Sequence, residues 1–323
     1  MSMKFRTEIT ITPSVSKIDQ NCRLFSLGSC FAHEMAERLE HIGIPTLCNP
    51  LGELYNPLSI EQCVARLLEG RTVTREELQR RGDMWFSYHT HGSFDRTDSE
   101  ALLESIAKAV GEGQRALRGA DVVILTLGSA WVYEREGEVV ANCHKMPAGE
   151  FVRRRLGVEE VVASLERVVD MLSPRKVIFT LSPVRHLADG LEGNALSKAT
   201  LRVALGEVCE RRKEAFYFPA YEILVDDLRD YRYYADDMTH PSRVSVDYVW
   251  ERFCDCFMEE KTIRSGEAFL RLAEAAAHRP LHPESEEYRR FRKTMLQRAE
   301  ALCSEFPDNP VAARLVECFA PEK

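Results

Sequence analysis

The chain has 323 residues, of which 45% are hydrophobic and 29% are charged, as in an ordinary globular protein. Its formal net charge of −8 argues against nucleic acid or an anionic membrane as the main partner, because both are bound through basic surfaces. No run of 18 apolar residues occurs, and residues 1–6 lack the apolar stretch of a secretory signal, so we expect a cytoplasmic protein.

An apolar strand over 24–28 is the first clear element, and it ends at a glycine. Two candidate nucleophiles, Ser29 and Cys30, follow directly. Apolar residues spaced by four, four and three then predict a helix over 31–42. Backbone N–H groups without a helical partner surround the start of a helix, so we expect this position to lower a thiol pKa and to hold a developing oxyanion.

Strands and helices alternate along the chain that follows. We predict strands at 44–48, 121–128, 176–181 and 216–218, and helices after a cap at Ser59 and over about 99–117, 158–172, 194–213, 221–228 and 242–260. This alternation predicts an α/β fold with a doubly wound parallel sheet. Such sheets bind ligands beyond the carboxyl ends of their strands, where Gly28, Asn49, Gly128 and Ser182 leave the predicted strands.

The composition changes near the C-terminus. Residues 263–323 are typical of two or three amphipathic helices, broken by prolines at positions 280, 307 and 310. We therefore expect a catalytic domain over 1–262 and a C-terminal α-helical extension over 263–323. Its apolar face either packs internally or binds a protein partner or a second copy of the chain.

A second polar stretch, at 236–242, contains a candidate base. Asp237 and His240 are three residues apart, so the carboxylate can orient an imidazole that activates a nucleophile. Asp236 is an alternative orienting group. In the simpler structural interpretation, Asp237 only caps the following helix and His240 is a surface residue.

The sequence Gly-Ser-Cys-Phe-Ala at 28–32 resembles the name-giving motif of the GSCFA family, whose proteins resemble the SGNH (GDSL-like) hydrolases. The resemblance covers about residues 20–260 and implies a sheet of flavodoxin-like order with the Asp-x-x-His pair near the end of the domain. An ungapped match to Gly-Asp-Ser-Leu puts Cys30 at the nucleophile position, and a shift of one residue puts Ser29 there. The structural alternatives are a helix cap for Ser29 and a small buried side chain for Cys30.

The resemblance also implies oxyanion donors from a glycine and an asparagine. Gly52 matches the glycine, but Ala130 stands where the asparagine is expected, and loss of such a donor typically costs roughly 100-fold in rate. We consider Asn49, Asn56, Ser129 and Asn142 as replacements, and His89, His144 and Arg185 as substrate contacts.

Together these residues predict acyl-ester chemistry, either hydrolysis of an ester or transfer of an acyl group to another acceptor. The family-level analogy suggests a small-molecule or glycan acyl substrate, and we expect no cofactor and no resident metal. The first alternative is a binding or scaffolding protein that keeps the fold without turnover. The second is a metal-dependent hydrolase built from the scattered histidines, whose spacing fits no familiar metal motif.

Overall fold

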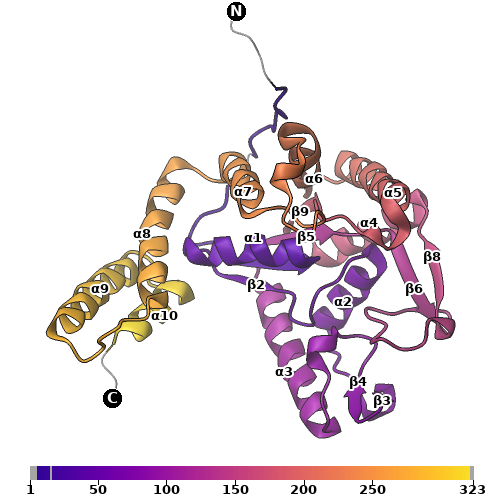
Figure 1. The fold of residues 1–323 in the computed structure, drawn as a ribbon, viewed down its shortest axis with the longest axis horizontal. Coiled ribbons are helices and arrows are strands. Elements are labelled where there is room, and N and C mark those ends of the chain that lie inside the picture. The colour runs from indigo at the N-terminus through magenta and orange to yellow at the C-terminus, as the bar shows by residue number, and fades with distance from the viewer. Residues whose placement is uncertain (1–5, 15–16, 321–323) are drawn as a thin grey trace, which may run out of the picture.

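The computed structural model describes residues 6–14 and 17–320. Residues 1–5, where we expected no secretory signal, and residues 15–16 and 321–323 lie outside this description. Within the described part, no helix is both long enough and apolar enough to cross a membrane. The described residues form a central α/β unit and a smaller group of C-terminal helices that lies to one side of it (Figure 1).

Five strands form the central sheet: β1 (Leu24–Gly28), β2 (Thr46–Cys48), β5 (Val122–Leu127), β9 (Lys176–Leu181) and β10 (Ala215–Phe218). All neighbouring strands run parallel, in the order β10-β9-β5-β1-β2. Numbered along the chain within this sheet, that is the 2-1-3-4-5 order of flavodoxin-like doubly wound sheets. The predicted doubly wound parallel sheet is confirmed, and each predicted strand is present.

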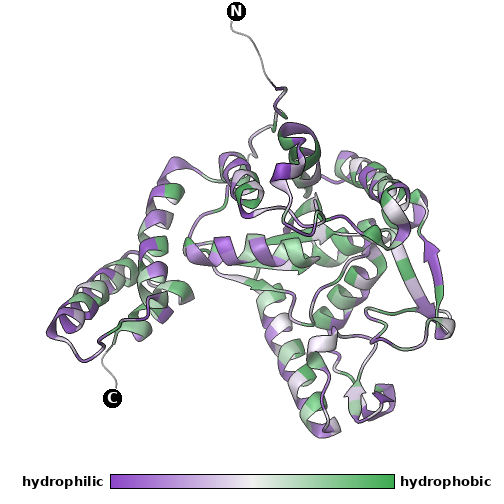
Figure 2. Cartoon of the chain, viewed as in Figure 1, coloured by the Kyte–Doolittle hydropathy of each residue, from purple (hydrophilic) through white to green (hydrophobic). Residues whose placement is uncertain are grey.

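Helices cover both faces of the sheet, which explains why its strands are mostly apolar. One face packs against α2 (Pro57–Glu69), α3 (Ser99–Arg118), α4 (Val158–Leu172) and α5 (Gly190–Arg211). The other packs against α1 (Cys30–His41), α6 (Ala220–Glu222), the π-helical turn Ile223–Leu228 and α7 (Arg243–Phe257). The helices carry both hydrophobic and hydrophilic residues, and β8, outside the central sheet, is largely hydrophilic (Figure 2).

The start of α2 differs from the prediction. Asn56 caps this helix, because its Oδ1 accepts a hydrogen bond of 2.8 Å from the backbone N–H of Ser59. Pro57 occupies the first helical position, where its fixed φ and missing N–H are tolerated. The prediction that Ser59 caps the helix is therefore wrong, since Ser59 lies inside its first turn.

Two small antiparallel sheets were not predicted. They are a hairpin of β3 (Gln79–Arg81) and β4 (Met84–Phe86), and a sheet of β6 (Trp131–Arg135), β7 (Glu138–Val139) and β8 (Val152–Arg155). Cross-strand charge pairing explains the arginine-rich β8: the guanidinium of Arg153 lies 4.0 Å from the Trp131 ring centre, and Arg154 pairs with Glu134 at 2.8 Å. Hydrophobic periodicity gives no signal for such strands.

The C-terminal helices α8 (Glu260–Ala277), α9 (Glu286–Glu305) and α10 (Pro310–Phe319) share an apolar cluster of their own. They dock on the turn that follows α1, at the opposite end of that helix from Cys30 (Figure 1). Phe269 packs on Gly43, where a β-carbon would lie 2.5 Å from the ring. The buried Asn309 Nδ2 donates to the carbonyls of Gln20 and Gly43, at 2.7 and 2.8 Å.

Asn309→Asp tests this docking. Asp keeps the oxygen that caps α10 but loses the two donors to Gln20 and Gly43, so we expect unfolding to become easier by about 2 kcal/mol or more. The control is Ser285→Ala, which removes only the cap of α9 and should cost about 1 kcal/mol. Urea denaturation measures both, and equal losses would contradict the docking role.

Candidate active site

The candidate site lies where the strand order of the sheet reverses, between β1 and β5. In doubly wound sheets this switch point opens the crevice that holds the ligand. Gly28, which ends β1, has a φ of +145°, and a β-carbon there would lie 2.2 Å from the carbonyl oxygen of Thr126 on β5. Only glycine fits this close contact, after which the chain turns into α1 with Ser29 and Cys30 at its start.

Cys30 is the first residue of α1 and is half-buried. It lines a cavity of about 310 Å³ between α1 and α7, and His240 lines the same cavity. Apolar side chains of Phe31, Val184 and Val246 make up part of the wall. The structure thus brings one predicted nucleophile and the predicted base to one cavity.

Burial raises the pKa of the Cys30 thiol, and the carboxylates of Glu53 and Glu34 act in the same direction. The backbone N–H groups of Phe31 and Cys30 lower it, but by less than burial raises it. The prediction of a lowered thiol pKa is therefore wrong: desolvation outweighs the start of the helix. The thiol is protonated at neutral pH, so a nucleophilic attack needs a base that takes its proton.

Ser29 is fully buried at the N-cap position of α1, yet its side chain makes no cap hydrogen bond. Its carbonyl accepts the Ala32 N–H at 2.8 Å, and its N–H donates to Thr126 at 3.2 Å. Within residues 6–14 and 17–320, Ser29 Oγ has no hydrogen-bond partner. The helix-cap interpretation of this hydroxyl is therefore wrong.

Asp237 and His240 form a closed turn, and both side chains are about half exposed. Asp237 Oδ2 lies 2.5 Å from His240 Nδ1, while Oδ1 accepts the backbone N–H groups of Thr239 and His240 at 2.9 Å each. These hydrogen bonds hold the pKa of Asp237 well below its usual value. Donation from Nδ1 leaves His240 Nε2 as the nitrogen available for proton transfer. Ser242, not Asp237, caps the following helix.

Arg185 supports this turn. Its guanidinium lies 3.9 Å from the ring centre of Tyr234, and its backbone N–H donates to the carbonyl of Thr239 at 3.1 Å. These contacts fix the loop that carries His240. Arg185, predicted as a substrate contact, is therefore placed as a positioning residue.

Two of the predicted oxyanion donors are already engaged. The N–H of Gly52 donates to the Asn49 carbonyl at 2.8 Å, so this glycine offers no free donor in the structure. Ser129 Oγ accepts from the backbone N–H of Trp131 at 3.0 Å and lies 3.4 Å from Ser197 Oγ, to which its hydroxyl can donate.

The side chains of two predicted asparagines differ in whether they keep a free donor. Both polar atoms of the Asn56 side chain form hydrogen bonds with Ser59, as the cap of α2. Asn49 Oδ1 accepts the Gly28 N–H at 2.8 Å, but its Nδ2 is buried and has no partner in the described part of the chain. Asn49 therefore keeps a side-chain donor beside β1.

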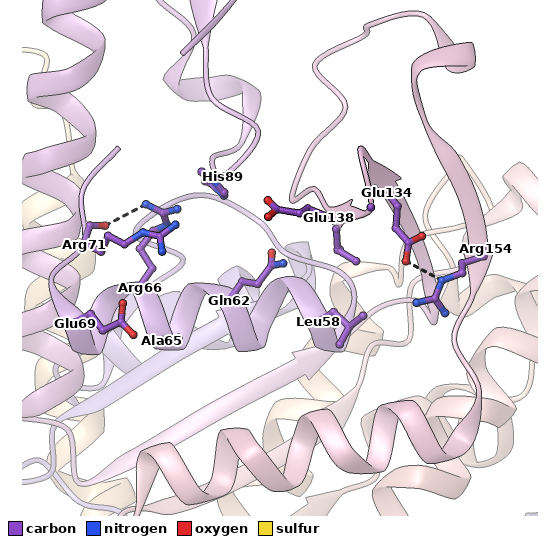
Figure 3. Close-up of a pocket in the computed structure, with 12 residues that line it drawn as sticks. Leu58, Gln62, Ala65, Arg66, Glu69, Arg71, His89, Glu134, Glu138 and Arg154 are labelled. Carbon is purple, nitrogen blue, oxygen red and sulfur yellow. Dashed lines mark hydrogen bonds and ion pairs between the residues drawn. The ribbon is translucent and has the colours of Figure 1, made fainter. Parts of the chain in front are cut away.

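The two predicted histidine contacts lie elsewhere. His89 lines a separate cavity of about 510 Å³ between α2 and the β6–β7 hairpin (Figure 3) and lies 3.4 Å from Glu77. His144 is buried, with Nε2 2.9 Å from the Thr90 carbonyl and its ring stacked on Phe86. Both histidines make structural contacts away from Cys30.

Two residues at the switch point were not among the predicted site residues. Lys198, buried in α5, donates from Nζ to the carbonyls of Gly128 and Ser182 at 2.8 and 2.7 Å. His186 places its buried Nε2 beside Gly128. The only signal for His186 was its position just after a predicted strand, and a lysine in the middle of a helix gives none.

Two protein-family models match this sequence. The model of the GSCFA family matches residues 23–253, which span the sheet, Cys30 and His240. The chain belongs to the GSCFA family. A second model, described as the GSCFA domain protein C-terminal domain, matches residues 270–318, within α8–α10. No curated protein matches this GSCFA-family chain. In its described residues, no three His, Cys, Asp or Glu side chains are grouped so that they could hold a metal ion.

The hydrogen bonds of the 237–240 turn let us predict the carboxyl pKa of Asp237. Its pKa is lowered, so the folded state favours the ionised carboxylate; that stabilisation is complete above the usual pKa of 3.8 and is lost as the pH falls further. Carbon-13 NMR of the Asp237 carboxyl should show a midpoint below 3.8 in the wild type. His240→Ala should raise the midpoint only in part, because the backbone donors remain. A midpoint unaffected by this substitution would contradict the Asp237–His240 pair.

Proposed function

We propose that this protein transfers acyl groups from esters, to water or to another acceptor, with Cys30 as nucleophile, His240 as base and Asp237 as the group that orients the base. The observation that carries the proposal is that Cys30 and His240 line one cavity, with the imidazole fixed by Asp237. The resemblance of the motif at 28–32 and of Asp-x-x-His to SGNH hydrolases supports the same chemistry.

In the proposed reaction, Cys30 Sγ attacks the ester carbonyl carbon while His240 Nε2 takes the thiol proton. A sulfur–carbon bond forms and the carbonyl electron pair moves to oxygen. When this intermediate collapses, the carbon–oxygen bond of the alcohol breaks and His240 returns the proton to the leaving alkoxide. Water or an acceptor hydroxyl then attacks the thioester, again with His240 as base, and Cys30 leaves as a thiolate that is reprotonated.

The raised pKa of Cys30 sets the role of His240 in this scheme. A preformed thiolate is rare at neutral pH, so the base must remove the proton during the attack. His240 is half exposed and lines the cavity, so in this scheme its Nε2 reaches the thiol there. Asn49 Nδ2 and the N–H of Cys30 are the proposed donors to the oxyanion on the β1 side.

The cavity suggests the kind of acyl group. About 310 Å³, walled in part by Phe31, Val184 and Val246, suits a short acyl group, with the alcohol part directed to solvent. A carbohydrate alcohol is the family-level analogy for that part.

A binding or scaffolding protein without turnover is the second candidate. The observations that favour it are the raised thiol pKa of Cys30 and the alanine at position 130. On either reading, a cytoplasmic location and a protein partner or self-association through α8–α10 stay predictions.

Reaction with p-nitrophenyl acetate tests the proposal. Peptide mapping after an acid quench should find the acetyl group on Cys30, and Cys30→Ala should lose it. His240→Ala should slow p-nitrophenol release by roughly 100-fold or more, because a positioned base contributes that much. The control His282→Ala, an exposed histidine between α8 and α9, should react as the wild type does.

The same experiment has two contrary outcomes. An acetyl group mapped to Ser29 and lost in Ser29→Ala would overturn the assignment of Cys30 as nucleophile. No acetylation at either residue would overturn the acyl-transfer proposal and favour the scaffold.

A further inference from the structure

The cavity that Cys30 and His240 line also has charged walls, which the proposed reaction does not use. Two guanidinium groups, those of Arg38 and Arg243, line it together with one carboxylate, that of Glu34. In ligand cavities that are otherwise largely apolar, a few charged groups of this kind set which ligand binds. The two guanidinium groups therefore indicate a charged group on the substrate.

The thiol and one of these guanidinium groups belong to the same helix. Cys30, Glu34 and Arg38 follow one another at intervals of four residues, so they lie near one face of α1. Eight residues span about 12 Å along a helix axis, and side chains lean toward the N-terminus of their helix. The long Arg38 side chain therefore covers part of the distance back to the thiol, and what remains is the length of a short acyl chain.

An ion pair holds Arg38 at the wall of the cavity. Its Nη2 lies 2.8 Å from Oδ1 of Asp247, which belongs to α7, so the pair links the two helices that enclose the cavity. The pair uses Nη2 and leaves the two N–H donors of Nη1. Asp247 is not among the residues that line the cavity. A ligand there meets the guanidinium of this pair rather than its carboxylate.

Arg243 lies on the opposite wall, at the first position of α7. Its side chain is exposed and forms no ion pair within residues 6–14 and 17–320. Glu34 carries the one negative charge among the lining residues, against the two positive charges of Arg38 and Arg243. The walls of the cavity therefore favour an anion over a cation.

We propose that the acyl group transferred by Cys30 is a short chain that ends in a carboxylate, and that Arg38 and Arg243 bind this carboxylate. The substrate is then a dicarboxylic acid with one carboxyl group esterified and the other free. The planar guanidinium suits this role because its N–H groups match the two oxygens of a carboxylate. The apolar part of the wall contacts the hydrocarbon chain between the two ends. The inference rests on the proposed acyl transfer and names its acyl group.

Two esters whose acyl chains have six carbons test this preference. Mono-4-nitrophenyl adipate ends in a carboxylate, whereas 4-nitrophenyl hexanoate ends in a methyl group. With the spontaneous hydrolysis of each ester subtracted, the wild type should show a kcat/KM at least roughly 10-fold higher for the adipate, because hydrogen bonds between charged groups contribute that much.

Four variants assign the preference to residues. Arg38→Met and Arg243→Met should each lower the ratio of the adipate kcat/KM to the hexanoate kcat/KM by several-fold. Glu34→Gln should raise this ratio, because it removes the negative charge from the wall of the cavity. The matched control is Arg264→Met, which removes an exposed arginine of α8 and should keep the wild-type ratio.

The contrary outcomes separate this inference from the proposed function. A wild-type ratio near one would overturn the carboxylate preference alone, since the hexanoate would still acylate Cys30. A high ratio that persists in both Arg38→Met and Arg243→Met would overturn the assignment to these arginines. Reaction of the wild type with neither ester would overturn the proposed function, and the inference with it.

A measurement on the wild type covers the case in which Arg38→Met, without its ion pair to Asp247, does not fold. Salt screens the attraction between charges, so the ratio should fall toward one in about 1 M NaCl. A ratio that stays the same at low and high salt would overturn the charged contact.

Discussion

The close contact between the ends of β1 and β5 is the constraint on which the rest of the site depends. At Gly28 the two strands approach so closely that no side chain fits, and the N–H of Ser29 bonds to the carbonyl of Thr126 at once. The chain must then turn sharply into α1. This turn separates two adjacent side chains: Cys30 lines the cavity with His240, and Ser29 lies buried beside Gly128.

The energetics of this region differ from those of the core around it. The strands bury almost only apolar side chains, whereas polar atoms of Ser29, Asn49 and His186 that have no partner within the described residues are buried at their carboxyl ends. The amine of Lys198 is buried there too, and burial lowers its pKa to about 7. Each unpaired group costs stability, and such costs persist mainly at sites of function. The C-terminal helices, by contrast, dock at the far end of α1. There the side-chain nitrogen and oxygen of Asn309 both form hydrogen bonds to the backbone.

The elements that depend on a hydrophobic pattern could be predicted from the sequence. The five parallel strands and the long helices follow from apolar runs and periodicity, and Cys30 and His240 follow from motif and spacing. The small sheet with β8 was missed because charge pairing, not periodicity, forms it. Three predicted site residues have polar side chains suited to a site, but the structure uses them elsewhere. Asn56 caps α2, His89 pairs with Glu77, and His144 stacks on Phe86. His186 becomes visible only when β9 and β5 are neighbours.

The most direct test of the account is which residue after β1 is nucleophilic. Wild type, Ser29→Ala and Cys30→Ala would each be treated with a fluorophosphonate and with iodoacetamide, and the adducts weighed as intact proteins. We expect alkylation at this junction that is lost only in Cys30→Ala, with no phosphonate adduct at Ser29. A phosphonate adduct lost only in Ser29→Ala would contradict it and make the protein a serine hydrolase.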